Sequence, residues 1–236
     1  MSLIKHSLSK RGFTLVEVMV SVAIIGIIAS VVVYNHGKFD SDLEINNAAY
    51  RMALSARQAQ VYGISAREVV GASVGSGVEA FSLSYGLHFN TTSVNPNKYI
   101  FFANADNFDQ IYTTVGDDFA CTSPECIEQT IIGRGITISG FWGLRGDTWT
   151  NLSLSGSGLY AIDILFKRPN PDAIFNFYLN GYPSSPSNDR CGTSTCDGVA
   201  VCLMSPQGRA KRMIVLVTGQ IAVENVGTTG TEPCHN

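Results

Sequence analysis

The stretch Lys10–Phe39, KRGFTLVEVMVSVAIIGIIASVVVYNHGKF, contains an apolar run long enough to cross a membrane. The run extends over 22 residues, from Phe13 to Tyr34, and Glu17 is its only charged residue. A helix of this length extends about 33 Å at about 1.5 Å per residue, which matches a hydrocarbon core of about 30 Å. The sequence therefore predicts a membrane-spanning helix over residues 13–34.

A cleaved secretory signal peptide is the alternative interpretation of this run. The apolar region of such a peptide usually has about 7–15 residues and ends in a small-residue cleavage site, whereas this run is longer and ends in Ser-Val-Val-Val-Tyr. Lys5, Lys10 and Arg11 precede the run, and no Asp or Glu does. The positive-inside rule therefore predicts a cytoplasmic N-terminus and an exported remainder.

The segment Gly12–Glu17, GFTLVE after a short basic leader, resembles the class III signal of type IV pilins and type II secretion pseudopilins. The resemblance covers the leader and the apolar run. It implies that a prepilin peptidase cuts between Gly12 and Phe13 on the cytoplasmic side and that Phe13 is then N-methylated. It also implies that the apolar run is retained, first as an anchor in the inner membrane and later in the core of a helical filament.

Glu17 is an unusual residue for a membrane segment. A charge inside the bilayer costs about 2.5–3.5 kcal/mol on insertion scales and persists mainly where it has a partner. Cleavage would create one, because the amine of Phe13 lies one helical turn away, and the positive end of the helix dipole also favours a carboxylate here. The family resemblance implies that Glu17 pairs with the Phe13 amine of a neighbouring subunit during assembly. The alternative is that Glu17 only lies at the headgroup boundary.

Beyond the run, the sequence predicts that one helix continues from Thr14 to Tyr62 and stops at Gly63. Apolar residues recur at helical spacing on one face: Leu43, Ala49, Met52, Ala53, Ala56 and Ala59. The other face shows Asn46, Arg51, Arg57 and Gln58. The predicted organisation is a leader (1–12), a transmembrane half-helix (13–34), an amphipathic half-helix (35–63) and an exported β-rich domain (64–236) with cysteine-rich insertions.

The remainder of the chain has β patterns. The segment 79–89, EAFSLSYGLHF, alternates apolar and polar residues, which predicts a half-buried strand with a solvated His88 on its polar face. Further predicted strands are Lys98–Ala103, Gly135–Phe141, Leu159–Lys167, Ile174–Leu179, Val199–Met204, Met213–Val217 and Gln220–Glu224. The predicted fold class is α+β, a long N-terminal helix packed on an antiparallel sheet or sandwich. The order of elements resembles the H-type minor pseudopilins and the related FimT-like minor pilins.

Six cysteines lie after the apolar run: Cys121, Cys126, Cys191, Cys196, Cys202 and Cys234. An even number in an exported domain indicates disulfides. Six cysteines permit 15 pairings, and proximity along the chain favours Cys121–Cys126, Cys191–Cys196 and Cys202–Cys234, the last of which would anchor the tail.

Two metal sites are alternatives that the sequence disfavours. A four-thiolate zinc site would usually have fewer residues between its paired cysteines, and zinc thiolates are rare in oxidising compartments. An acidic segment lacks the full spacing of a calcium loop, so a solvated loop is preferred. Its acids are Asp106, Asp109, Asp117 and Asp118. We expect no metal and no cofactor.

Arg209, Lys211 and Arg212 are candidate DNA contacts, because some FimT-like proteins are DNA receptors. In those proteins the basic residues lie toward the C-terminus, but here the last thirteen residues have no Lys or Arg, which disfavours DNA binding. No Ser/His/Asp arrangement has a convincing local context for catalysis.

These patterns together predict a non-enzymatic minor pilin or pseudopilin of a type II secretion pseudopilus or a type IV pilus. The expected partners are other pilin subunits, the prepilin peptidase that also methylates, and inner-membrane lipid, with the C-terminal domain in the periplasm or outside the cell. The alternatives are a DNA-uptake minor pilin and, less favoured by the sequence, a membrane-tethered enzyme. The sequence does not separate secretion from pilus use.

Overall fold

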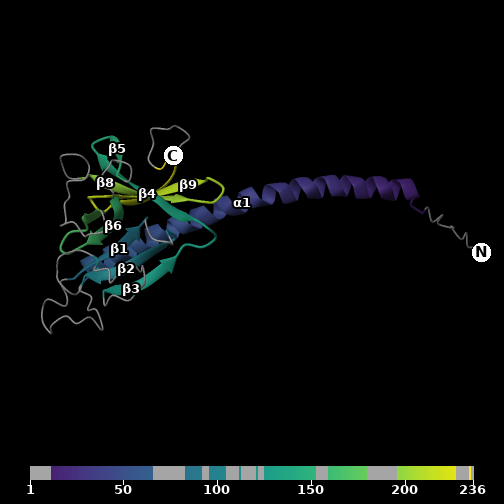
Figure 1. The fold of residues 1–236 in the computed structure, drawn as a ribbon. Helices are drawn as coiled ribbons and strands as arrows, with labels where there is room; N and C mark the ends of the chain where they lie inside the picture. The colour runs from purple at the N-terminus through teal and green to yellow at the C-terminus, as the bar shows by residue number, and fades with distance from the viewer. Residues whose placement is uncertain are drawn as a thin grey trace, which may run out of the picture. The chain divides into compact units, whose positions relative to one another are not determined.

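The computed structural model describes residues 12–65, 83–91, 96–104, 112, 121, 125–152, 159–179, 196–226 and 234. Within these residues, helix α1 (Leu15–Ile64) comes first and ten strands follow it (Figure 1). The chain divides into two compact units, residues 1–40 and residues 41–236, which we describe separately. A helix followed by two antiparallel sheets confirms the predicted α+β class.

The described part of the first unit is the apolar half of α1 and the three residues before it. Within the described residues, Leu15–Tyr34 is the one helical stretch long and apolar enough to cross a membrane, with a mean hydropathy of 2.6. Every described side chain from 12 to 34 is exposed in the isolated chain. Residues 12–34 therefore bury no core among themselves, and their apolar surface requires lipid or other protein.

The second unit contains two five-stranded antiparallel sheets. The first sheet has the order β3 (Cys126–Ile131), β2 (Lys98–Asn104), β1 (Ser84–Asn90), β6 (Leu159–Phe166) and β7 (Ala173–Leu179). The second has the order β10 (Ile221–Asn225), β9 (Ala210–Leu216), β8 (Gly198–Met204), β4 (Thr137–Arg145) and β5 (Thr148–Asn151).

The sequence did not predict two of these strands, β3 and β5. Both are edge strands of their sheets, and no residue of either is fully buried. A strand with no fully buried face does not need the apolar alternation on which the sequence prediction depended.

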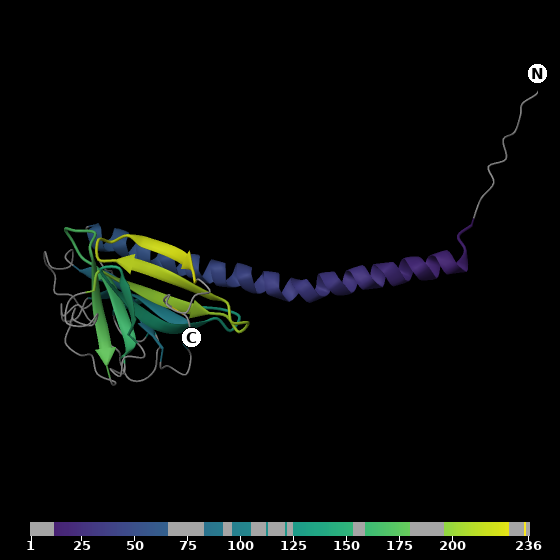
Figure 2. The same ribbon diagram turned by 90° about the horizontal axis from the view of Figure 1, so that it is seen from above.

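One hydrophobic core joins the 41–64 part of α1 to both sheets, and Figure 2 shows this part of the helix beside the strands. The helix contributes mostly small side chains: Ile45, Ala49, Met52, Ala53, Ala56 and Ala59. Gly63 allows a close approach, since a Cβ atom there would overlap the backbone carbonyl of Phe166. Leu43 was expected on this core face, but it is 46% exposed and Ile45 fills the place instead.

His88 is buried, so the prediction of a solvated side chain was wrong. It is 1% exposed on the outer face of the first sheet, directly opposite Asp163 on β6. His88 Nδ1 lies 2.6 Å from Asp163 Oδ1, and the Tyr178 hydroxyl donates to Asp163 Oδ2. The Tyr112 backbone N–H also donates to Asp163 Oδ2, at 2.9 Å. Residues distant in sequence therefore cover this polar face and satisfy its carboxylate.

Candidate functional site

Helix α1 begins at a cap formed by Thr14. The Glu17 backbone N–H donates to Thr14 Oγ1 at 3.2 Å, and the Val18 N–H donates to the Thr14 carbonyl at 3.2 Å. Thr14 is therefore the N-cap residue, and Glu17 occupies the third helical position, which is the spacing of a capping box. The sequence prediction placed Thr14 inside the helix and missed this cap, although Thr-x-x-Glu was the available signal.

Gly12 and Phe13 precede the helix and have no regular secondary structure. Phe13 is 81% exposed, and a Cβ atom at Gly12 would meet nothing within 4 Å. A protease acts on accessible backbone outside helices and strands, and the Gly12–Phe13 bond has both properties in the isolated chain. Cutting this bond would place a new amine one residue before the cap, at the positive end of the helix dipole.

The polar side chains inside the apolar run are satisfied by the helix itself. Ser21 Oγ donates to the Glu17 carbonyl at 2.7 Å, and Ser30 Oγ donates to the Ile27 carbonyl at 2.7 Å. Serine hydroxyls bonded in this way can enter an apolar environment without an unsatisfied donor. Glu17 is then the one ionisable side chain between Phe13 and Tyr34.

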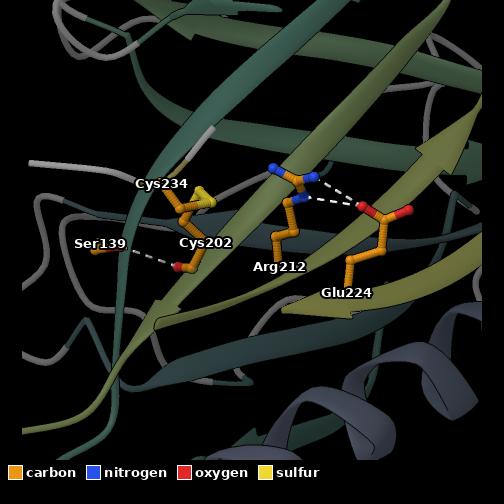
Figure 3. The surroundings of a disulfide bond; sticks show 5 residues. All are labelled: Ser139, Cys202, Arg212, Glu224 and Cys234. Carbon is orange, nitrogen blue, oxygen red and sulfur yellow. Dashed lines mark hydrogen bonds and ion pairs between the residues drawn. A yellow bond between two sulfur atoms is a disulfide. The ribbon is translucent and has the colours of Figure 1, made fainter. Parts of the chain in front are cut away.

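The structure contains disulfides between Cys121 and Cys126 and between Cys202 and Cys234. Cys196 is also disulfide-bonded, and its expected partner, Cys191, lies outside the described residues. Cys202 belongs to β8, and its carbonyl accepts a hydrogen bond from Ser139 Oγ at 3.4 Å (Figure 3). The four-thiolate zinc site would need the sulfurs of Cys121, Cys126 and Cys196 as thiolates, but all three are disulfide-bonded.

Two of the three candidate DNA contacts are already paired with carboxylates of the same chain. Arg209 Nε lies 3.2 Å from Asp42 Oδ1. Arg212 donates from Nε and Nη2 to Glu224 Oε2, at 3.1 and 2.8 Å (Figure 3). Lys211 lies between them on β9 and is partly buried. A phosphate would have to displace carboxylates from this cluster.

The acidic segment proposed as a calcium alternative lies outside the described residues. This applies to Asp106, Asp109, Asp117 and Asp118. Within the part of the chain that the structure describes, no group of three or more His, Cys, Asp or Glu side chains is placed to hold a metal ion.

Comparison with known families identifies one segment. Residues 8–33 match the family model of the prokaryotic N-terminal methylation motif, a signal of the type IV pilin kind. Among curated proteins and solved structures, none matches this chain. The match includes the Gly12–Phe13 bond, Thr14 and Glu17, and it supports a pilin-like or pseudopilin protein that a prepilin peptidase processes and that assembles with other pilins.

Proposed function

We propose that this chain is a non-enzymatic minor pilin or pseudopilin, cut between Gly12 and Phe13 and N-methylated at Phe13. The observation that carries the proposal is the methylation motif over residues 8–33, together with an accessible Gly12–Phe13 bond at the start of an apolar helix. The helix anchors the subunit in the inner membrane with its N-terminus in the cytoplasm, and the disulfide-bonded domain lies on the opposite side. Glu17 receives the Phe13 amine of a neighbouring subunit during assembly.

An H-type minor subunit is the finer proposal. A long helix whose second half shares a core with two antiparallel sheets supports it, because that order of elements resembles the group. A minor subunit is present in few copies and joins a filament built mainly of other pilins. Its deletion is expected to reduce filament number or secretion while leaving the major subunit stable in the membrane.

Mass spectrometry of the mature protein from the membrane fraction tests the processing step. The N-terminal peptide should begin at Phe13 and carry one methyl group. Gly12→Val is the matched variant, because a branched side chain at the cut site should block the peptidase and leave the leader in place. A filament-associated chain that begins at Met1 or Ser2 would overturn the proposal.

A further inference from the structure

A groove of about 310 Å³ lies between the 41–64 part of α1 and the outer edge of the first sheet. Asn47 and Arg51 line it from the helix, and residues 130–134, the end of β3 and the turn after it, line it from the sheet. Tyr99 of β2 also lines the groove, and its hydroxyl is hydrogen-bonded to Ser55 at 3.0 Å. The volume is at the small end of the range for ligand sites, about 300–1,000 Å³.

The strand beside this groove has an open backbone edge. The Ile132 N–H donates to the Asn97 carbonyl at 2.7 Å, and the neighbouring pair is Ile131 opposite Lys98. Because bonded and non-bonded pairs alternate between antiparallel strands, the N–H and C=O groups of Ile131 point away from β2. No hydrogen bond to another described residue uses them, and Ile131 is 60% exposed. An edge of this kind accepts an additional strand.

The open part of this edge is short. A bulge between Phe101 and Phe102 disturbs the pairing near the start of β3, and the charged residue Glu128 is exposed there. Bulges and charges are features that protect an edge strand from pairing with another sheet. Both lie outside residues 130–134, so the open end has room for a short extended segment and not for the full edge of a second sheet.

The charges of the groove favour a carboxylate. Glu44 and Arg134 both line it and form an ion pair, so they neutralise each other. Arg51 is exposed and makes no hydrogen bond or ion pair with any residue that the structure describes. It is therefore the uncompensated charge among the described lining residues. A guanidinium can bind a carboxylate through two parallel hydrogen bonds.

We propose that this groove binds an extended peptide segment of a partner protein, added as a strand beside β3, with an Asp or Glu side chain on Arg51. The pairing fixes the pattern that is recognised. Ile131 shares the outer face of the sheet with Lys98, whereas Thr130 shares the inner face with Tyr99, which packs in the core with α1. A peptide residue opposite Ile131 exchanges two backbone hydrogen bonds with it and turns its side chain outward.

The next peptide residue turns inward, toward the helix and Arg51. The recognised pattern is therefore an apolar residue, packed beside the exposed Ile131 side chain, directly next to an Asp or Glu. This site goes beyond the proposed function, because neither cleavage at Gly12 nor methylation of Phe13 is needed for it.

Selection from a phage-displayed library of random short peptides tests the proposal. The target is the full chain in lipid nanodiscs, and empty nanodiscs remove peptides that bind lipid. The enriched peptides should share an Asp or Glu next to an apolar residue. Fluorescence anisotropy of the most enriched peptide, made synthetically with both ends blocked, then gives its affinity.

Variants of the chain and of this peptide test the two contacts separately. Arg51→Gln should weaken binding by about tenfold or more, because a charge-assisted hydrogen bond is lost. Arg145→Gln is the matched control, since Arg145 is exposed at the end of β4 in the other sheet, and it should leave the affinity unchanged. Replacing the peptide acid by its amide should weaken binding to the wild type but not further weaken binding to Arg51→Gln.

N-methylation of the peptide backbone, one residue at a time, tests strand addition. Methylation should abolish binding at the residue that pairs with Ile131 and be tolerated at the residue next to it, whose N–H points away from β3. Four outcomes would each overturn the proposal: no enriched peptide, enriched peptides without an acid, equal affinities for Arg51→Gln and Arg145→Gln, or an N-methylation profile without alternation.

Discussion

Glu17 occupies a position at which its side chain can act on the helix as well as on assembly. Its backbone N–H is bonded to Thr14 Oγ1, and a Glu three residues after the N-cap is the acid of a capping box when its carboxylate accepts from the N-cap backbone N–H. A carboxylate in the first turn also interacts favourably with the helix dipole. Any experiment on Glu17 must therefore separate helix capping from a charge–charge contact with a neighbouring subunit.

Replacement of Glu17 by Gln makes that separation, because Gln keeps the capping geometry and removes the charge. We expect Glu17→Gln and Glu17→Val to enter the membrane as well as the wild type or better, since each removes a charge from an apolar segment. Both should be depleted from sheared filaments, because the Phe13 amine of the neighbour loses its carboxylate. Wild-type incorporation of Glu17→Gln would assign the residue to capping alone.

Ionisation of Tyr178 should lower the stability of the domain at alkaline pH. Burial raises the pKa of Tyr178 well above its ordinary value of 10.0, and the Asp163 carboxylate raises it further. The folded state therefore retains a proton that the unfolded state releases above about pH 10. The stabilisation is complete below that pH and is lost as pH rises toward the folded-state pKa.

Denaturant unfolding of the wild type and Tyr178→Phe at pH 8 and pH 10.5–11.5 measures this dependence. At pH 8 the variant should be less stable by about 1–3 kcal/mol, because a buried hydrogen bond to a carboxylate is lost. Above pH 10 the wild type should lose stability more steeply than the variant, so the difference should shrink. Parallel pH profiles for the two proteins would contradict the assignment.

At the scale of elements, a close contact between α1 and the first sheet depends on Gly63. A Cβ atom there would overlap the backbone carbonyl of Phe166, which a rotamer change cannot relieve. Gly63→Ala should therefore lower the free energy of unfolding by about 1–3 kcal/mol, although Ala favours helix intrinsically.

Gly133→Ala is the matched control, because nothing lies within 4 Å of a Cβ atom built at that position. Urea unfolding of both variants under the same conditions gives the comparison. The prediction for Gly63 fails if the two alanine variants are equally stable.

Element types could be predicted from the sequence wherever an apolar period was present. The alternation in β1 and the long apolar helix are local properties. The helix expected from Thr14 to Tyr62 runs from Leu15 to Ile64, and the described part of the strand expected over 79–89 is β1, Ser84–Asn90. The phase of the amphipathic helix was predicted less well, because Leu43 and Ile45 are both apolar and only the position of the sheets decides which is buried. The edge strands β3 and β5 had no period from which to predict them.

The candidate site could be predicted to a similar extent. Gly12, Phe13 and Glu17 form a contiguous motif, so their proximity needs no tertiary structure. The burial of His88 could not be predicted, because its partner Asp163 is 75 residues away and is brought opposite only by the pairing of β1 with β6. The partners of Arg209 and Arg212 likewise depend on contacts that the local sequence does not specify.

At the scale of the whole molecule, the two described disulfides close loops of very different length. Cys202–Cys234 spans 32 residues and Cys121–Cys126 spans 5. The loop-entropy relation gives a stabilisation of about 4 kcal/mol for the longer loop and about 2 kcal/mol for the shorter. The tail disulfide should therefore matter more for the unfolding of the domain.

Denaturant unfolding of two double variants, Cys202→Ala/Cys234→Ala and Cys121→Ala/Cys126→Ala, tests this order. The variant without the Cys202–Cys234 disulfide should lose more stability, and each double variant serves as the control for the other. Alkylation of the wild type without reductant should modify no thiol, as measured by intact mass. Equal losses would contradict the loop-length argument, and six modified thiols would contradict the disulfides themselves.

The net charge of the mature subunit bears on the DNA-uptake alternative. The chain has 16 basic and 19 acidic residues. Removing the leader takes away Lys5, Lys10 and Arg11 and no acid, which leaves 13 basic residues and a net charge of −6. DNA binding gains most of its affinity from cation–phosphate contacts, and that affinity falls steeply with salt. An acidic subunit can bind DNA only through a local basic patch.

The strongest candidate for such a patch is the cluster Arg209, Lys211 and Arg212, and its two arginines are already paired with Asp42 and Glu224. We therefore expect the full mature chain in neutral detergent to give no gel shift of duplex DNA at about 0.15 M salt. Asp42→Asn/Glu224→Gln is the informative variant, because it frees both arginines and should produce weak binding that disappears as salt rises. If the wild type already binds at micromolar concentration, and alanine at the three basic positions abolishes that binding, the chain is a DNA-uptake pilin. The same binding unaffected by those substitutions would assign the contact to another surface.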